Sequence, residues 1–133
     1  MRRFWWIGVG LALVGASPAA AEDRWWREVP DVYASQIWSG GGLLAGRTEF
    51  ALGDDGQLIG RYSFVEHDGS REHGTLDGCE PSGRRRLVCR WHDDYGDGLL
   101  KVQFSQGLER FDGGWSQSGK AVRPWRGERI PRS

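Results

Sequence analysis

Turn-forming residues interrupt this chain about every 8–12 residues and separate short runs of β-branched and aromatic residues. Asp54-Asp55-Gly56, Asp68-Gly69, Gly96-Asp97-Gly98 and Ser118-Gly119 are of the kind that tight hairpins use, because Asp and Gly tolerate positive φ. Each connection is too short for the crossover that joins parallel strands. Consecutive strands are therefore expected to pair as an antiparallel meander.

The runs between these turns predict eight strands, and no helical period follows residue 31. Eight antiparallel strands can close into a small barrel, which leaves no unpaired edge. We therefore predict an all-β fold, a single up-and-down barrel over residues 33–130. The predicted strands are Tyr33–Trp38, Arg47–Leu52, Leu58–Glu66, Arg71–Cys79, Arg85–His92, Leu99–Ser105, Glu109–Trp115 and Ala121–Arg129.

Alternation along the predicted strands indicates which side chains face the barrel interior, since successive residues of a strand point to opposite faces. Charged and polar side chains occupy the intervening positions. The expected interior residues are mostly large and apolar: Phe50, Leu52, Tyr62, Phe64, Leu87, Trp91, Leu100, Phe104, Phe111 and Trp115.

One predicted strand, residues 71–79, does not fit this alternation. If Cys79 faces the interior, then His73 and Asp77 also point inward and Leu76 points outward. A buried Asp or His without a partner is costly. Two interpretations stay open: a β-bulge resets the strand, or the barrel interior is polar at one end and marks a ligand site.

Cys79 and Cys89 are the only cysteines. The sequence at 83–86 predicts a hairpin turn, and the two cysteines lie about equally far from its centre. They are then opposite each other on adjacent strands, at the short separation that a disulfide requires. We predict a Cys79–Cys89 disulfide, as expected in an oxidising compartment. Their spacing does not match the redox motif Cys-x-x-Cys.

Residues 1–21 have the pattern of a cleaved signal peptide. Arg2 and Arg3 supply the positive start, residues 4–16 are apolar, and Ala19-Ala20-Ala21 offers the small residues of a cleavage site. The apolar run is about 13 residues, shorter than the roughly 20 of a spanning helix. We expect a periplasmic or secreted bacterial protein with no membrane segment after cleavage, in which residues 22–32 form an N-terminal arm.

The charge balance argues against nucleic-acid binding, because 18 Lys and Arg residues are matched by 18 Asp and Glu residues. No specific catalytic, metal or nucleotide motif is present, and we expect neither enzymatic activity nor a cofactor. His67, His73 and His92 suggest a zinc site as an alternative, but their spacing matches no recognised ligand motif. The acidic loop 93–98 suggests Ca²⁺ or, more simply, a hairpin turn.

Two segments resemble known exported barrels. Residues 55–62, Asp-Gly-Gln-Leu-Ile-Gly-Arg-Tyr, are similar to a turn and strand of avidins, and Phe111-Asp112-Gly113-Gly114-Trp115 ends in an aromatic residue as avidin strands do. The chain thus resembles the avidin and lipocalin type of eight-stranded meander barrel over about residues 33–129. The avidin opening Gly-x-Trp-x-Asn is absent at 37–40, so no biotin-binding residue is carried over. The resemblance implies a fold that often holds one small ligand.

The candidate ligand-binding residues combine aromatic side chains with the polar positions of strand 71–79. Aromatic rings either fill a small core or line a pocket for a flat ligand, and both interpretations stay open. We expect a small hydrophobic or aromatic ligand, bound by Tyr62, His73, Asp77, Trp91, Trp115 and Trp125.

The arm carries Trp25 and Trp26, two large rings whose exposure to water on a free tail is unfavourable. They either close one end of the barrel or engage a protein partner. An exported barrel with one disulfide and an N-terminal arm is similar in architecture to bacterial metalloproteinase inhibitors, with which the chain shares no motif. A protein-binding module acting through residues 22–32 is therefore the second functional hypothesis.

Overall fold

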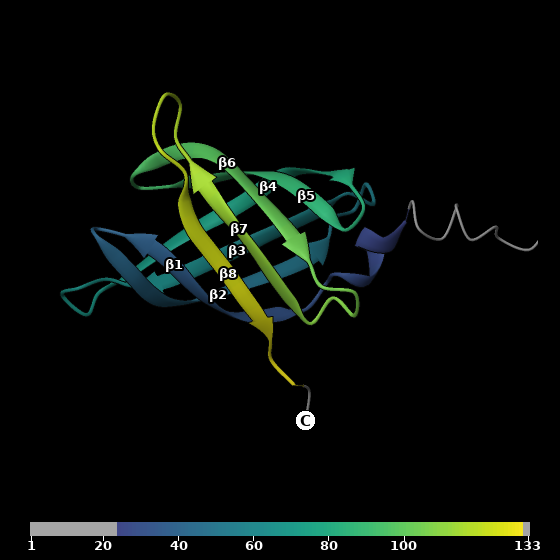
Figure 1. Ribbon diagram of the computed structural model, residues 1–133, viewed down its shortest axis with the longest axis horizontal. Helices are drawn as coiled ribbons and strands as arrows, with labels where there is room; N and C mark the ends of the chain where they lie inside the picture. Colours follow the sequence, from purple (N-terminus) through teal and green to yellow (C-terminus); the bar gives the residue numbers. More distant parts are fainter. Residues whose placement is uncertain (1–23, 132–133) are drawn as a thin grey trace, which may run out of the picture.

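A computed structural model describes residues 24–131, which form one closed antiparallel barrel in up-and-down order (Figure 1). Each strand pairs with its neighbour in sequence, and β1 closes the ring against β8 from Tyr33–Arg129 to Ile37–Trp125. The predicted fold class is confirmed. The elements are η1 (Trp25–Glu28), β1 (Val32–Ser39), β2 (Gly42–Leu52), β3 (Leu58–Val65), β4 (Arg71–Gly83), β5 (Arg86–Asp93), β6 (Gly96–Phe104), β7 (Arg110–Ser116) and β8 (Arg123–Arg129).

Strands β2 and β4 extend furthest beyond their predicted bounds. The turn at Gly40 and Gly41, both at positive φ, joins β1 directly to β2. Residues 42–46, which precede the predicted strand Arg47–Leu52, therefore already pair with β1. β4 continues to Gly83 and forms a hairpin with β5, where Arg85 adopts a φ of 56°.

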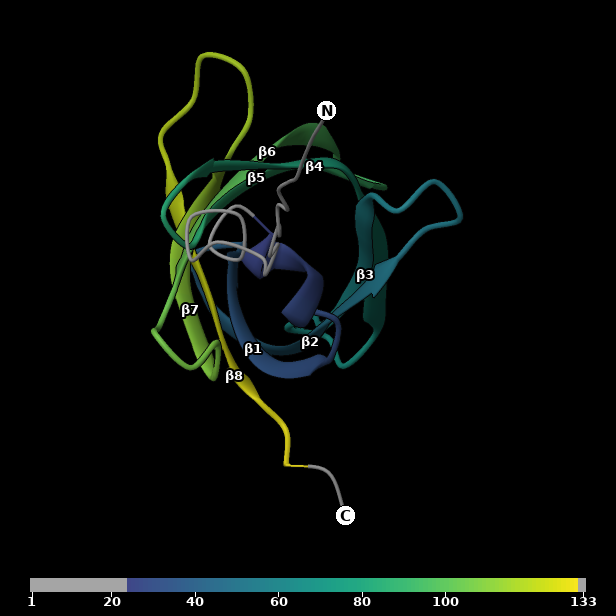
Figure 2. The ribbon, with the colours of Figure 1, turned by 90° about the vertical axis from the view of Figure 1, so that its right-hand side faces the viewer.

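Aromatic side chains fill one half of the barrel. Tyr33, Phe50, Phe104 and Phe111 contact one another with ring centroids 5.3 to 6.1 Å apart. The 3-10 helix η1 closes this end, as Figure 2 shows, and Trp25 packs on Phe104 at 5.8 Å. The four rings are at most 2% exposed, so this half is a packed core, and the ring contacts add to the stabilisation that comes from buried area.

The predicted alternation is confirmed for most interior positions and wrong for Leu52. Phe50, Leu100 and Phe104 are at most 2% exposed, whereas Leu52 is 44% exposed. Leu52 is the last residue of β2, beside the turn that begins at Gly53, so its side chain reaches solvent at the rim of the barrel.

A β-bulge in β4 resolves the conflict found in residues 71–79. The β4–β5 register shifts between Asp77 and Glu80, and Gly78 adopts a φ of 57° that suits glycine. His73 and Asp77 therefore lie on the exposed outer face, and Leu76 is buried. The bulge interpretation is correct, and the inward orientation of His73 and Asp77 is wrong.

Beyond the bulge, Cys79 returns to the interior and forms the predicted disulfide with Cys89, with a Cα–Cα distance of 4.0 Å. Both cysteines are buried. The link ties β4 to β5 at the point where the bulge interrupts their pairing, so it replaces the ladder contacts that are lost there.

Several large interior rings lie over a glycine directly across the ladder. The register pairs Tyr62 with Gly74, Trp91 with Gly98 and Phe111 with Gly127. A Cβ on Gly74 would overlap the Tyr62 ring, and one on Gly127 would come within 2.6 Å of Phe111. These glycines leave room for rings to lie flat on the neighbouring strand, which lets a narrow barrel hold many aromatic residues.

The predicted signal peptide, residues 1–21, lies outside the described residues, as does the start of the predicted arm. Within residues 24–131 there is no helix with the length and apolar character needed to cross a membrane. Strand β1 begins at Val32, the last residue of the predicted arm.

Candidate functional site

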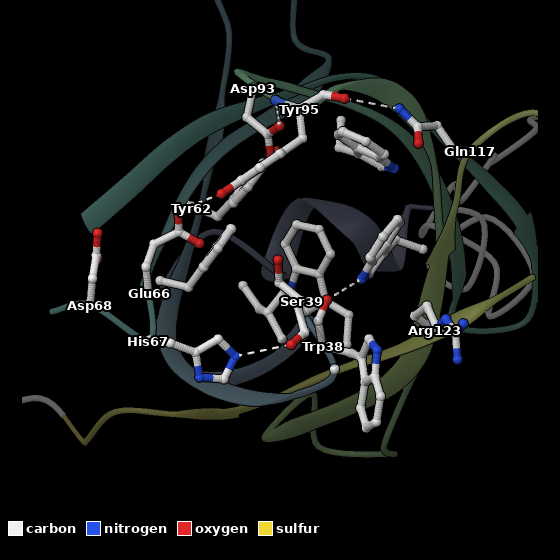
Figure 3. A pocket seen from close by; sticks show the side chains of 17 residues that line it. Trp38, Ser39, Tyr62, Glu66, His67, Asp68, Asp93, Tyr95, Gln117 and Arg123 are labelled. Atoms are coloured by element: carbon white, nitrogen blue, oxygen red, sulfur yellow. Dashed lines mark hydrogen bonds between the residues drawn. The ribbon is translucent and has the colours of Figure 1, made fainter. Parts of the chain in front are cut away.

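The end of the barrel opposite η1 is hollow. A cavity of about 680 Å³ opens there (Figure 3). This end carries the turns that connect β1 to β2, β3 to β4, β5 to β6 and β7 to β8. In an up-and-down barrel, alternate connections gather at the same end, so residues far apart in sequence meet at one mouth. The rim residues are Ser39, Gly40 and Gly41; Glu66, His67 and Asp68; Asp93 and Tyr95; and Gln117 and Arg123.

Aromatic rings form the walls and floor of the cavity. Trp91 and Trp115 meet edge to face at 5.4 Å, and Tyr62 meets Trp125 in the same way at 4.6 Å. Trp115 is only partly buried, so part of its ring remains accessible. The surface offered to a ligand is therefore flat and largely apolar, which suits stacking on another flat group.

The indole N–H groups of three tryptophans are already engaged. Trp115 Nε1 donates to the carbonyl of Trp38 at 2.9 Å, and Trp91 Nε1 donates to that of Ser116 at 3.3 Å. Trp125 Nε1 donates to Thr48 Oγ1 at 3.0 Å. These bonds hold each ring in one orientation, so the aromatic surface is formed before any ligand arrives.

A buried polar network lies beneath Trp125. Thr48 Oγ1 is 2.7 Å from Ser35 Oγ, and the Ser35 hydroxyl donates to the carbonyl of Tyr33 at 3.2 Å. Both side chains are nearly inaccessible, and each finds a partner there. The network therefore lies between the hollow end and the packed core, and each of its buried polar groups has a hydrogen-bond partner.

One side of the mouth is acidic. The Tyr62 hydroxyl donates to Asp93 Oδ2 at 2.7 Å, and Asp93 Oδ1 accepts from the Tyr95 amide at 2.8 Å. The Tyr95 hydroxyl reaches over to donate to Glu66 Oε2 at 2.5 Å. Figure 3 shows these four side chains on the same side of the opening.

Burial and the neighbouring carboxylates both raise the pKa values of the two tyrosines on this side. Burial is the largest cause that raises the pKa of Tyr62, and its hydrogen bond to Asp93 adds to the increase. The hydrogen bond to Glu66 is the largest cause that raises the pKa of Tyr95 to about 12. Both hydroxyls thus remain protonated donors at neutral pH.

The other side of the mouth carries Trp38 and Arg123. The Arg123 guanidinium lies 5.7 Å from the centroid of the Trp38 ring, within the range of a cation–π contact. Figure 3 shows this pair across the opening from Glu66. His67 Nε2 lies 3.2 Å from the Gly40 carbonyl, which can only accept, so this nitrogen carries the proton.

Four of the six predicted ligand-binding residues come together in this cavity: Tyr62, Trp91, Trp115 and Trp125. The other two do not. Asp77 faces solvent, 3.1 Å from His92 Nε2, and His73 lies exposed on the same outer face of β4. The β4 bulge is the reason, because it reverses the orientation assumed for both.

Sequence reasoning missed the acidic side and Trp38. Asp93 and Tyr95 belong to a segment interpreted as a turn, and residues 94–95 do form the β5–β6 turn. The available signal was topological: the turns after Ser39, Glu66, Asp93 and Ser116 are alternate connections and must meet. Within residues 24–131, no group of three or more His, Cys, Asp or Glu residues is arranged to hold a metal ion.

Comparisons with known proteins add no relative: no family model matches the chain, and no match is found among curated proteins or solved structures. The fold and the candidate site therefore rest on the geometry of this chain.

Proposed function

We propose that this protein is an exported, non-enzymatic barrel that binds a small ligand with a flat apolar body in its hollow end. The observation that carries the proposal is the cavity of about 680 Å³ walled by tryptophans whose N–H groups are already bonded. Ligand sites in proteins are typically about 300–1,000 Å³ and mostly apolar, with a few polar groups that fix orientation.

The architecture of the barrel is a second observation that supports this proposal. A closed up-and-down barrel filled at one end and hollow at the other is compatible with an avidin-like or lipocalin-like carrier. The buried Cys79–Cys89 disulfide fits an oxidising compartment, in agreement with the predicted export to the periplasm or medium.

The decisive experiment measures ligand binding to the chain without residues 1–21. A thermal-shift screen covers flat heterocycles, fatty acids, sugars and divalent metals. A ligand at 100 times its Kd adds about 2.7 kcal/mol to the free energy of unfolding and raises the Tm. We expect stabilisation by flat apolar compounds, and no stabilisation by any class would contradict the proposal.

A matched pair of variants then locates the site. Trp115→Ala removes a ring from the cavity wall, and we expect it to weaken binding at least about tenfold. Trp26→Ala removes a tryptophan that packs at the filled end, and it should leave Kd unchanged if the variant is folded. Equal effects of the two substitutions would place the ligand elsewhere.

The second hypothesis, partner binding through residues 22–32, stays a prediction. Trp25 and Trp26 pack against the core in the described part of the arm, so they contribute to closing the barrel end. No observation among the described residues favours a protein partner over this packing role, and we do not propose one.

A further inference from the structure

We infer that the ligand of the hollow end carries a positive charge, as a protonated amine or a related cation attached to its flat body. This inference rests on the proposed function and specifies the ligand class. The cavity has two unlike sides, a tryptophan side that suits a ring and a carboxylate side that suits a cation.

Among the described residues, no Lys or Arg pairs with the carboxylates of the mouth, where His67 is the neighbouring imidazole. Glu66, Asp68 and Asp93 line the cavity, and none forms a salt bridge with another described residue. Arg123, the one arginine or lysine that lines the cavity among residues 24–131, lies instead over Trp38. An ionised carboxylate can only accept hydrogen bonds, so a ligand group placed beside Glu66 and Asp93 must be a donor, and a charged donor gains most.

A fourth carboxylate, which is buried and does not line the cavity, adds to the negative potential at the mouth. Glu72 of β4 is only 8% exposed, and its Oε2 accepts from the Asp94 amide at 2.9 Å. Within residues 24–131 it has no salt-bridge partner either. A charge buried this far from water is screened little, so its attraction reaches into the cavity.

The same carboxylates act on the two tyrosines of the mouth. Asp93 and Glu72 both contribute to raising the pKa of Tyr62, after its burial. The hydrogen bond to Glu66 is the largest cause that raises the pKa of Tyr95, and the charges of Glu66, Glu72 and Asp93 add to the increase. A field that opposes the formation of a phenolate also attracts a cation, because both effects have the same electrostatic origin.

The geometry also places the cation beside rings. Tyr62 and Tyr95 donate to Asp93 and Glu66, so the phenol rings stand next to the carboxylates. The faces of aromatic rings attract cations, most strongly where water is excluded. A ligand whose ring stacks near Trp115 can therefore direct an ammonium group toward Glu66 and Asp93.

A matched series of ligands tests the inference. The series comprises 2-(2-naphthyl)ethylamine, the corresponding alcohol and the corresponding carboxylic acid, measured by calorimetry at low ionic strength, where screening is weak. We expect the amine to bind at least about tenfold more tightly than the alcohol and the carboxylate to bind most weakly. Raising the salt concentration should reduce the difference.

Charge-neutral variants assign the effect to the mouth. Glu66→Gln and Asp93→Asn should each reduce the preference for amine over alcohol at least about threefold while changing the Kd of the alcohol much less. Glu109→Gln removes the same charge from an exposed position after β6, at the filled end, and should preserve the preference. An equal loss in Glu109→Gln would mean that net charge, and no local site, selects the ligand.

The outcomes separate this inference from the proposed function. If the three compounds bind with similar affinity and Trp115→Ala weakens all of them, the cavity binds flat ligands and the charge inference is overturned. If the carboxylate binds best, Arg123 selects the ligand and the inference is again overturned. If none of the series binds to the folded protein, the charge inference fails, and the proposed function fails with it if no compound of the thermal-shift screen stabilises the protein.

Discussion

A single methyl group added at Gly74 tests how tightly the cavity floor is built. Tyr62 lies directly across the β3–β4 ladder from Gly74, and a Cβ at that position would overlap the phenol ring. Tyr62 lines the cavity, but its ring is held in place by an edge-to-face contact with Trp125 and by the hydrogen bond of its hydroxyl to Asp93. Gly74→Ala must therefore displace the ring or separate the strands.

The cost follows from two contributions. Forcing an extra methyl group against a fixed ring is a form of overpacking, which typically destabilises by about 1–3 kcal/mol. Displacement of Tyr62 also strains its hydrogen bond to Asp93, a bond to a charged group that is worth about 1.5–3 kcal/mol when lost completely. We expect Gly74→Ala to lower the free energy of unfolding by about 2–4 kcal/mol and the Tm by roughly 8–16 °C for a domain of this size.

Urea denaturation and thermal unfolding measure this cost, and Gly42→Ala provides the control. A Cβ on Gly42 would lie 3.8 Å from His67 Cε1, an ordinary contact, and its φ is not positive. We expect that substitution to change stability by less than about 1 kcal/mol, on the stabilising side.

A double-mutant cycle identifies the cause. In the Tyr62→Ala background, Gly74→Ala should cost almost nothing, because the ring that blocks the methyl group is gone. The coupling between the two sites should then be at least about 2 kcal/mol. A Gly74→Ala substitution as mild as Gly42→Ala, or equally costly with and without Tyr62, would refute the reasoning.

Two further predictions concern the polar groups of the hollow end. Thr48→Val keeps the shape of a fully buried residue but leaves Trp125 Nε1 without its acceptor, so we expect a loss of about 1–3 kcal/mol in chemical denaturation, whereas the exposed Thr75→Val should change stability by less than about 0.5 kcal/mol. Equal losses of stability in the two variants would show that the buried hydrogen-bond network does not stabilise the protein. The pKa of Tyr95 is raised to about 12, chiefly by its hydrogen bond to Glu66. The raised pKa stabilises the folded protein, and this contribution is complete below pH 10.0, the ordinary pKa of tyrosine, and is lost as the pH rises from about 10 to about 12. In an ultraviolet titration, the transition of Tyr95 is the one that Tyr95→Phe abolishes. Glu66→Gln should move this transition toward pH 10, and an unmoved transition would contradict the assigned cause.

Much of the fold could be predicted because its determinants are local. Alternation and turn chemistry predicted eight strands, and the hairpin at 83–86 placed Cys79 opposite Cys89. Leu52 was misplaced because alternation does not tell where a barrel rim ends. The β4 bulge depends on Gly78 adopting a φ of 57°, and a glycine within a strand does not itself reveal whether it bulges.

The site was harder to predict because it depends on which side chains meet across the barrel. Tyr62 and Trp91 follow from alternation, whereas Trp38, Glu66 and Asp93 require the ends of four strands to be brought together. The misassignment of His73 and Asp77 has one physical cause, the bulge between them and Cys79. Whether the interior is hollow depends on how the rings pack, which no local pattern encodes.

The most direct test of the account is a ¹H–¹⁵N correlation spectrum of the tryptophan indole N–H groups, recorded as a naphthyl amine is added. We expect the signals of Trp91 and Trp115, on the cavity wall, to shift with saturation, while those of Trp25 and Trp26, at the closed end, stay in place. Shifts confined to Trp25 and Trp26, or none at all at concentrations where calorimetry detects binding, would contradict a ligand site in the hollow end.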